Sequence, residues 1–287
     1  MQLNNKKAII TGGSMGLGKT ILKKFVLEGA DVVICARNVS TLIETAEEMK
    51  QFFVRENQRV IGVPADISRE EDANRVVKTC VDTFGRVDIL VNNAGIHGAK
   101  GEFDLVDLDE WKQAIEVNLY GTVHMIRGVA PYMKNQDYGK IISISGGGAT
   151  GARPYFTAYA ASKTAIVRLT ETIAKEWEQY HIDINAIAPG AMNTRLLEDI
   201  LSAGEAIGAE YQGALKRKEN GGEPTDTGAD LCVFLAGEQS NGISGRLISA
   251  VWDNWETLPQ HAEQVKNSDI YTLRRIISKD RGYDWEK

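Results

Sequence analysis

Short apolar runs alternate with longer segments of helical periodicity along most of the chain. The apolar runs predict strands at residues 7–11, 31–36, 59–64, 87–91, 140–145, 182–187 and 246–250. The segments between them predict helices that begin near Leu17, Ser40, Arg69, Leu108, Tyr155, Thr194 and Thr225. This repeated order predicts the α/β class, with one doubly wound parallel sheet and helices on both faces. Such a sheet binds ligands beyond the carboxyl ends of its strands.

The alternation stops after residue 250 and divides the chain into two parts. We expect residues 1–250 to form one domain and residues 251–287 a C-terminal extension. Trp252 and Trp255 lie in the extension, and rings of this size usually bury much of their surface. The extension is therefore predicted to pack on its own domain or on a neighbouring subunit, and the alternative is an inert surface appendage.

The composition is typical of a soluble globular protein: 287 residues, 43% hydrophobic and 25% charged, with a formal net charge of -6. Because the chain has neither a basic block nor an apolar run of membrane-spanning length, we expect no nucleic-acid partner and no membrane partner. The first predicted strand begins too early for a signal peptide, and three scattered cysteines form no disulfide framework. Both features favour the cytoplasm. The histidines lack metal-ligand spacing, so no metal is expected.

A glycine-rich turn follows the first predicted strand. Thr11 ends the strand, and Gly12, Gly16 and Gly18 bracket the turn. Glycines let the backbone approach a phosphate group, and the N–H groups at a helix start point toward it. Residues 13–20 also match the P-loop of nucleoside triphosphatases, with Asp66 as a candidate magnesium ligand. Both interpretations place phosphates at the same helix start, so the turn alone does not distinguish them.

Tyr159 and Lys163 are four residues apart in a predicted helix, which places both side chains on one face. A neighbouring ammonium group favours phenolate and is expected to lower the tyrosine pKa from its ordinary value of about 10. A tyrosine of lowered pKa can act as a general acid or base closer to neutral pH. The same spacing also occurs on many solvated helices, so the pair needs support from the rest of the chain.

Further motifs supply that support in a fixed order. They are Asn92-Asn93-Ala94-Gly95, Asn118, Ser143-Ile144-Ser145, Tyr159 with Lys163, and Pro189-Gly190 followed by Thr194. Together with the glycine-rich turn, the set resembles the short-chain dehydrogenase/reductase family over roughly residues 5–250. The resemblance favours a Rossmann-type dinucleotide-binding domain over the P-loop alternative.

The resemblance implies a role for each matching residue. Gly12, Ser14, Gly16, Leu17 and Gly18 would line a pyrophosphate, Asp66 and Ile67 would hold an adenine, Asn93, Ala94 and Gly95 would lie along its ribose, and Pro189, Gly190 and Thr194 would contact the nicotinamide end. Tyr159 would be the general acid, while Lys163 would lower its pKa and bind the nicotinamide ribose. Asn118 would hold a water molecule in the proton relay, or would merely interrupt a helix. Gly190 would otherwise be an ordinary loop glycine.

The implied function is that of an NAD(P)-dependent oxidoreductase that interconverts a ketone and a secondary alcohol. Its partners would be a small carbonyl or alcohol substrate and further copies of the chain, as a dimer or tetramer. A non-catalytic dinucleotide-binding sensor or scaffold is one alternative. A nucleotide-sugar epimerase or dehydratase is another, although such enzymes usually carry a substrate domain larger than the extension found here.

Cofactor choice depends on the end of the second predicted strand. The acid that accepts the ribose 2′-hydroxyl in NAD enzymes is missing at Ala36, and Arg37 follows at once. Because a guanidinium group can pair with a 2′-phosphate, NADP is the expected cofactor. No second basic residue stands at Ser14 or Met15, so NAD stays open as an alternative.

The family's usual active-site serine lies one position nearer the tyrosine than Ser145 does. A gapless comparison therefore places Gly146 in that role, followed by two more glycines. Either the glycine run bends so that Ser145 still reaches the substrate, which makes Ser145 a catalytic candidate, or the hydroxyl group is absent. The strand pattern places Ser143 and Ser145 on one face, and a shift by one residue would point Ser145 away from the site.

The segment from residue 194 to residue 224 is expected to form a mobile helical cover over the substrate pocket, because it follows Pro189-Gly190 and contains Gly204, Gly208 and Gly213. Its alternative is a flexible surface helix. Arg153 and Tyr155 add charge and aromatic surface near the site, which is compatible with a polar substrate such as a sugar.

Overall fold

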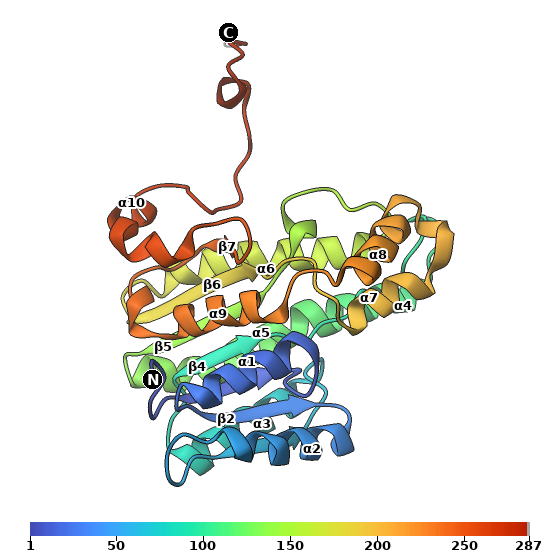
Figure 1. The fold of residues 1–287 in the computed structure, drawn as a ribbon. Coiled ribbons are helices and arrows are strands. Elements are labelled where there is room, and N and C mark those ends of the chain that lie inside the picture. Colours follow the sequence, from blue (N-terminus) through green and yellow to red (C-terminus); the bar gives the residue numbers. More distant parts are fainter. Residues whose placement is uncertain (286–287) are drawn as a thin grey trace.

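The computed structural model describes residues 1–285 (Figure 1). Seven parallel strands form one sheet in the order β3-β2-β1-β4-β5-β6-β7. They are β1 (Lys7–Thr11), β2 (Asp31–Ala36), β3 (Val60–Pro64), β4 (Ile89–Asn92), β5 (Gly139–Ile144), β6 (Ile182–Ala188) and β7 (Leu247–Ser249). The predicted α/β class and doubly wound parallel sheet are confirmed.

Helices cover both faces of the sheet (Figure 1). One layer contains α1 (Gly16–Leu27), α2 (Val39–Met49) and α9 (Thr225–Ala236), and the other contains α3 (Glu70–Phe84), α5 (Gly121–Asn135) and α6 (Thr157–Glu176). Neighbouring residues of β1 face different layers, because side chains alternate along a strand. Ile10 packs in the apolar cluster that contains Phe25 of α1, and Ile9 packs in the cluster that contains Val77 of α3. The near-continuous apolar strands in the sequence reflect this burial on two sides.

The helix expected to begin near Leu108 is interrupted. It consists of α4 (Leu108–Ile115), a π-helical turn (Glu116–Tyr120) and α5. Such turns are rare and occur frequently at functional sites. Asn118, which belongs to this turn, is buried. Among the helices of residues 1–285, none combines the length and apolarity needed to cross a membrane.

Two helices form the segment predicted to cover the pocket: α7 (Arg195–Ser202) and α8 (Ala209–Asn220). Leu197 of α7 and Ala214 of α8 are buried in one small apolar cluster with Phe156 and Tyr159. The segment therefore packs directly on the N-terminal end of α6, where the chemistry was predicted.

The first part of the C-terminal extension packs on the main apolar cluster through Leu258 and Val265, the latter from α10 (Ala262–Lys266). The ring of Trp255 packs at a tilt against Phe234 of α9, with ring centroids 5.3 Å apart. Trp252 does not follow the prediction, since its side chain is 86% exposed. Beyond the packed part, the chain extends away from the body of the domain (Figure 1). The domain boundary after residue 250 stays a prediction.

Candidate active site

A cavity of about 690 Å³ opens at the carboxyl ends of the central strands, a size typical of small-molecule sites. It lies where the chain order of the strands reverses, between β1 and β4, which is the usual ligand position in such sheets. Among the predicted residues, its lining includes Gly12, Ser14, Gly16, Leu17, Gly18, Arg37, Asp66, Ile67, Asn93, Ala94, Gly95, Tyr159, Lys163 and Thr194. Residues far apart in the sequence are thus brought to one cleft.

The glycine-rich turn is shaped for close approach. Gly12 and Gly16 have φ values of 65° and 51°, which L side chains rarely adopt. A Cβ atom at Gly18 would lie 2.2 Å from the carbonyl oxygen of Gly12, so no larger residue fits there. No side chain caps the start of α1, so its first N–H groups are available for an anionic ligand.

The geometry does not favour the P-loop alternative. Lys19, which would have to reach the phosphates, instead pairs with Glu48 of α2 at 2.5 Å. Asp66, the candidate magnesium ligand, accepts hydrogen bonds from the backbone and the hydroxyl group of Ser68. Both side chains therefore take part in local structure instead.

Asn93 connects the glycine-rich turn to the end of β4. Its amide nitrogen donates to the carbonyl oxygens of Thr11 and Gly12, at 2.9 and 3.1 Å. The hydroxyl group of Thr11 in turn accepts from the backbone nitrogens of Asn93 and Ala94. These bonds hold two loops in a fixed relation across the floor of the cleft.

Tyr159 and Lys163 lie on one face of α6 and are almost fully buried. The ammonium group of Lys163 donates to the carbonyl oxygen of Ile144 at 2.7 Å and lies 5.7 Å from the centre of the Tyr159 ring. Burial lowers the pKa of Lys163 to about 8. Burial also raises the pKa of Tyr159, and Arg153 is the cation that opposes this rise. The net direction of the Tyr159 pKa is therefore upward, opposite to the predicted lowering, because loss of solvent outweighs nearby charge.

Asn118 is held firmly by the loop that follows β4. Its side-chain oxygen accepts from the backbone nitrogen of Ile96 at 2.8 Å, and its nitrogen donates to the Ile96 carbonyl and the Ser162 hydroxyl, both at 2.9 Å. A Cβ atom at Gly95 would lie 3.1 Å from this side-chain oxygen and 3.3 Å from the Lys163 ammonium. Asn118 thus fixes the loop beside Lys163. Its role is therefore larger than the alternative in which it merely interrupts a helix.

The hydroxyl group of Ser145 points into α6. It donates to the carbonyl oxygen of Lys163 at 3.3 Å and is buried. A Cβ atom at Gly146, in contrast, would lie 3.1 Å from the Tyr159 hydroxyl oxygen. Gly146 has an extended φ of 169°, which any residue can adopt. Of the two sequence-based alternatives, this geometry favours the one in which the serine hydroxyl is absent.

The nicotinamide-end residues are less uniform. Thr194 lines the cavity, whereas Pro189 and Gly190 are not among its lining residues. Gly190 has a φ of 97°, and a Cβ atom there would lie 2.8 Å from a methyl group of Val251. Pro189 occupies the space over Gly228 of α9. Both shape the loop that leads to α7.

The sequence reasoning missed a histidine beside Tyr159. His97 is buried, and its ring centroid lies 4.9 Å from that of Tyr159. Its Nδ1 lies 2.9 Å from a carboxylate oxygen of Asp199 in α7, and the other oxygen pairs with Lys100 at 3.0 Å. Burial lowers the pKa of His97, so the ring is neutral at neutral pH. Its position two residues after Gly95 is the signal that could have revealed it.

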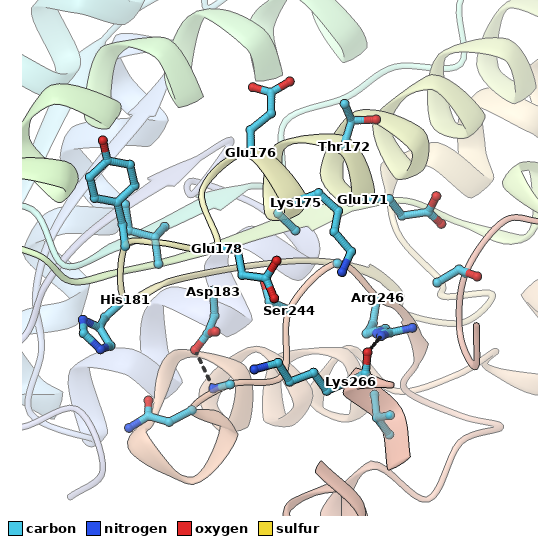
Figure 2. Close-up of a pocket in the computed structure, with 18 of the residues that line it drawn as sticks. Glu171, Thr172, Lys175, Glu176, Glu178, His181, Asp183, Ser244, Arg246 and Lys266 are labelled. Carbon is cyan, nitrogen blue, oxygen red and sulfur yellow. Dashed lines mark hydrogen bonds between the residues drawn. The ribbon is translucent and has the colours of Figure 1, made fainter. Parts of the chain in front are cut away.

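A larger hollow of about 1080 Å³ lies elsewhere, between the end of α6 and the C-terminal extension (Figure 2). Its lining includes Asp183, whose carboxylate accepts from the backbone nitrogen of Gly242, and Arg246, which donates to the Ser268 carbonyl. Because Asp183 lies near the start of β6, this hollow is at the amino ends of the strands. It therefore faces away from the glycine-rich turn and from Tyr159.

Comparison with known proteins places the chain in a family. A family model described as short chain dehydrogenase matches residues 6–204. The chain is 32% identical to the (2S)-[(R)-hydroxy(phenyl)methyl]succinyl-CoA dehydrogenase subunit BbsD of Thauera aromatica, over 86% of this chain and 96% of that protein. It is 31% identical to the D-beta-hydroxybutyrate dehydrogenase of Rhizobium meliloti (strain 1021), over 85% and 96% respectively.

Solved structures agree with this placement. A dehydrogenase/reductase from Sinorhizobium meliloti 1021 matches with a TM-score of 0.74 and 27% identity, over 86% of this chain and 94% of that chain. Levodione reductase matches in fold with a TM-score of 0.79 and 24% identity, over 86% and 96%. Given the family match, the relatives and the shared fold, this chain belongs to the short-chain dehydrogenase/reductase family of oxidoreductases.

Proposed function

We propose that the protein is an NAD(P)-dependent oxidoreductase that interconverts a ketone and a secondary alcohol, with Tyr159 as its general acid and base. The observation that carries this proposal is the shared cleft, which is lined by the glycine-rich turn at one end and by Tyr159 and Lys163 at the other. The relatives named above as dehydrogenases support the same reaction class.

The cleft fits a dinucleotide. The uncapped start of α1 offers N–H groups to a pyrophosphate, and Gly12 and Gly16 let the backbone approach it. Asp66 and Ile67 line the adenine end, and Thr194 lines the nicotinamide end. Arg37 is exposed at the cleft, and Ala36 supplies no acid for a ribose 2′-hydroxyl. These features favour NADP over NAD.

Burial keeps Tyr159 protonated at neutral pH, which suits a general acid. A reduced dinucleotide held by the glycine-rich turn and Thr194 would supply hydride chemistry for ketone reduction. The Tyr159 hydroxyl gives its proton to the carbonyl oxygen, so that a secondary alcohol forms and a phenolate is left. Lys163 stabilises that phenolate by its charge, and solvent returns the proton through a water molecule held beside Asn118. Oxidation of the alcohol follows the same steps in reverse.

The missing hydroxyl at Gly146 is the observation that favours the alternative of a non-catalytic sensor. A substrate oxygen beside Tyr159 would have one hydrogen-bond donor fewer, which lowers catalytic power without affecting dinucleotide binding. His97 and Arg153 lie close to the Tyr159 ring and offer polar surface in the same region.

Both functions are distinguished by one set of measurements. Reduced nicotinamide absorbance should fall when a panel of ketones is added to the wild-type protein, and Tyr159→Phe should abolish turnover while its dinucleotide dissociation constant stays within about twofold. Tight dinucleotide binding without turnover of any ketone or secondary alcohol would instead support the sensor and contradict the enzyme.

A further inference from the structure

The cover helix α8 presents one charged face toward Tyr159. Glu210, Ala214 and Arg217 are spaced by four and three residues, so their side chains lie on the same side of the helix. Ala214 is buried in the apolar cluster that contains Phe156 and Tyr159. Glu210 and Arg217 therefore lie on either side of Ala214, along the face of α8 that packs in this cluster.

Two guanidinium groups meet one carboxylate at this place. Arg153, in the loop before α6, donates from Nε and Nη2 to one oxygen of Glu210, at 3.2 and 2.9 Å. Its guanidinium carbon lies 4.1 Å from the Phe156 ring centre and 5.3 Å from that of Tyr159. Arg217 interacts electrostatically with both Glu210 and Arg153. The three groups together carry one excess positive charge, and Arg153 is the member that lies next to Tyr159.

Arg217 has donors without acceptors. Its Nε and Nη2 atoms are buried, and within residues 1–285 no acceptor lies within hydrogen-bond distance of either. These two nitrogens form one edge of the guanidinium plane, the edge whose parallel N–H bonds match the two oxygens of a carboxylate or phosphate. Buried polar groups in native proteins are nearly always paired, so an unpaired edge calls for a missing partner.

We propose that Arg217, supported by Arg153, binds an anionic oxygen group of the substrate, a carboxylate or a phosphate, while the substrate carbonyl lies at Tyr159. This inference rests on the proposed function and adds the substrate class. Glu210 holds Arg153 over Phe156 and leaves the Arg217 edge unoccupied. An incoming anion neutralises the excess charge and satisfies both donors.

Matched substrates test this anion-binding subsite at Arg217. Unbranched oxo acids with the ketone at carbon 3, 4, 5 or 6 are compared with their neutral primary amides and with oxoalkyl phosphates of equal length. For the wild type, we expect kcat/KM for the best anion to exceed that for its amide by about tenfold to a hundredfold, the value of a hydrogen-bonded charge. The higher kcat/KM, for the oxo acid or for the oxoalkyl phosphate, then shows whether the subsite binds a carboxylate or a phosphate.

Substitutions in α8 show which residue causes the preference for the anion over the amide. Arg217→Ala should lower kcat/KM for the anion much more than for the amide and so remove the preference for the anion, whereas Arg217→Lys should keep part of the preference because a point charge remains. Lys216→Ala is the control, since Lys216 is exposed on the same helix. The proposed subsite would be overturned if Arg217→Ala and Lys216→Ala lost equal amounts of kcat/KM for the anion. It would also be overturned if the wild type showed no preference for the anion over the amide.

Calorimetric titration separates this inference from the proposed function. The full chain is titrated with the same acids, phosphates and amides, with and without oxidised NADP, so that no reduction occurs. An anion that binds the wild type at least about tenfold more tightly than Arg217→Ala supports the subsite even if no ketone is turned over. Equal binding of anion and amide contradicts the subsite even in an active enzyme.

Discussion

A Cβ atom at Gly146 would lie 3.1 Å from the hydroxyl oxygen of Tyr159. The position that faces the tyrosine is thus occupied by a residue without a side chain, while the neighbouring Ser145 turns its hydroxyl into α6. The space beside the phenol is left to substrate, to water or to the backbone. This arrangement leads to two predictions about the same strand end.

Replacing Ser145 by alanine should have little effect on catalysis. Because its hydroxyl donates to the Lys163 carbonyl, we expect Ser145→Ala to retain kcat within about threefold, whereas loss of a transition-state hydrogen bond costs on the order of a hundredfold or more. Tyr159→Phe, measured in parallel, should lose at least about a hundredfold in kcat, because the change removes the proposed general acid. A hundredfold loss in Ser145→Ala would restore the serine to the catalytic group.

Adding a methyl group at Gly146 should disturb the tyrosine. The phenol oxygen must shift by a few tenths of an ångström to accept a Cβ atom at 3.1 Å, and small misplacements of catalytic groups are costly. We expect Gly146→Ala to lower kcat by about threefold to tenfold, with dinucleotide affinity unchanged. Gly147→Ala is the matched control, because a Cβ atom there would meet nothing within 4 Å. Equal kcat values for the two variants would show that the contact is unimportant.

Hydrophobic periodicity was sufficient to predict the sheet, because each strand is short, apolar and separated from the next by a helix. The glycine-rich turn and the Tyr159 spacing also located the cleft, since both depend on local backbone geometry. The direction of the Tyr159 pKa was not predictable, because it depends on burial by Phe156 and the cover helices. The position of His97 after Gly95 marks the residue but not its contact with Asp199, and the unpaired edge of Arg217 has no sequence signal, because both depend on how the cover helices pack.

Arg37 should determine the preference for NADP over NAD. If its guanidinium pairs with a 2′-phosphate, Arg37→Ala lowers kcat/KM for NADPH by about tenfold to a hundredfold and leaves that for NADH within about twofold. Lys50→Ala, at the opposite end of α2, is the control for a change of net charge near the same helix. Equal kcat/KM for NADPH and NADH in the wild type would refute the assignment to NADP. So would an equal loss of kcat/KM for both cofactors in Arg37→Ala.

The packed part of the C-terminal extension should be needed for stability, and its outer part should not. Arg246 donates to the carbonyl oxygens of Ser268 and Ile270, and Leu258 is buried in the main cluster. A chain that ends at Leu273 should melt within about 2 °C of the full chain, while one that ends at Ala250 should melt at least about 10 °C lower. Leu258→Ala, which keeps the whole extension, should cost about 2–5 kcal/mol of unfolding free energy. Unchanged melting of the shorter chain and of Leu258→Ala would show that this packing is dispensable.

Lys163 should destabilise the folded protein at neutral pH. Its folded pKa of about 8 lies below the ordinary value of 10.5, because the buried ammonium loses its solvent. Below about pH 8 the group is protonated in both states and the destabilisation is complete. Between about pH 8 and 10.5 the unfolded state binds more protons, so the free energy of unfolding rises with pH.

Replacing Lys163 by methionine should therefore increase stability while abolishing activity. The fall in the Lys163 pKa from 10.5 to about 8 corresponds to a destabilisation of the folded state by about 3 kcal/mol. The methionine removes this destabilisation but leaves the Ile144 carbonyl unpaired, which costs about 1 kcal/mol. Urea unfolding at pH 7 should thus show Lys163→Met to be more stable than the wild type by about 2 kcal/mol, with the gap shrinking by pH 9.5. Lys175→Met, an exposed site on the same helix, should show no such gap. A destabilised Lys163→Met with a pH-independent difference would mean that the buried ammonium is stabilised by partners other than solvent.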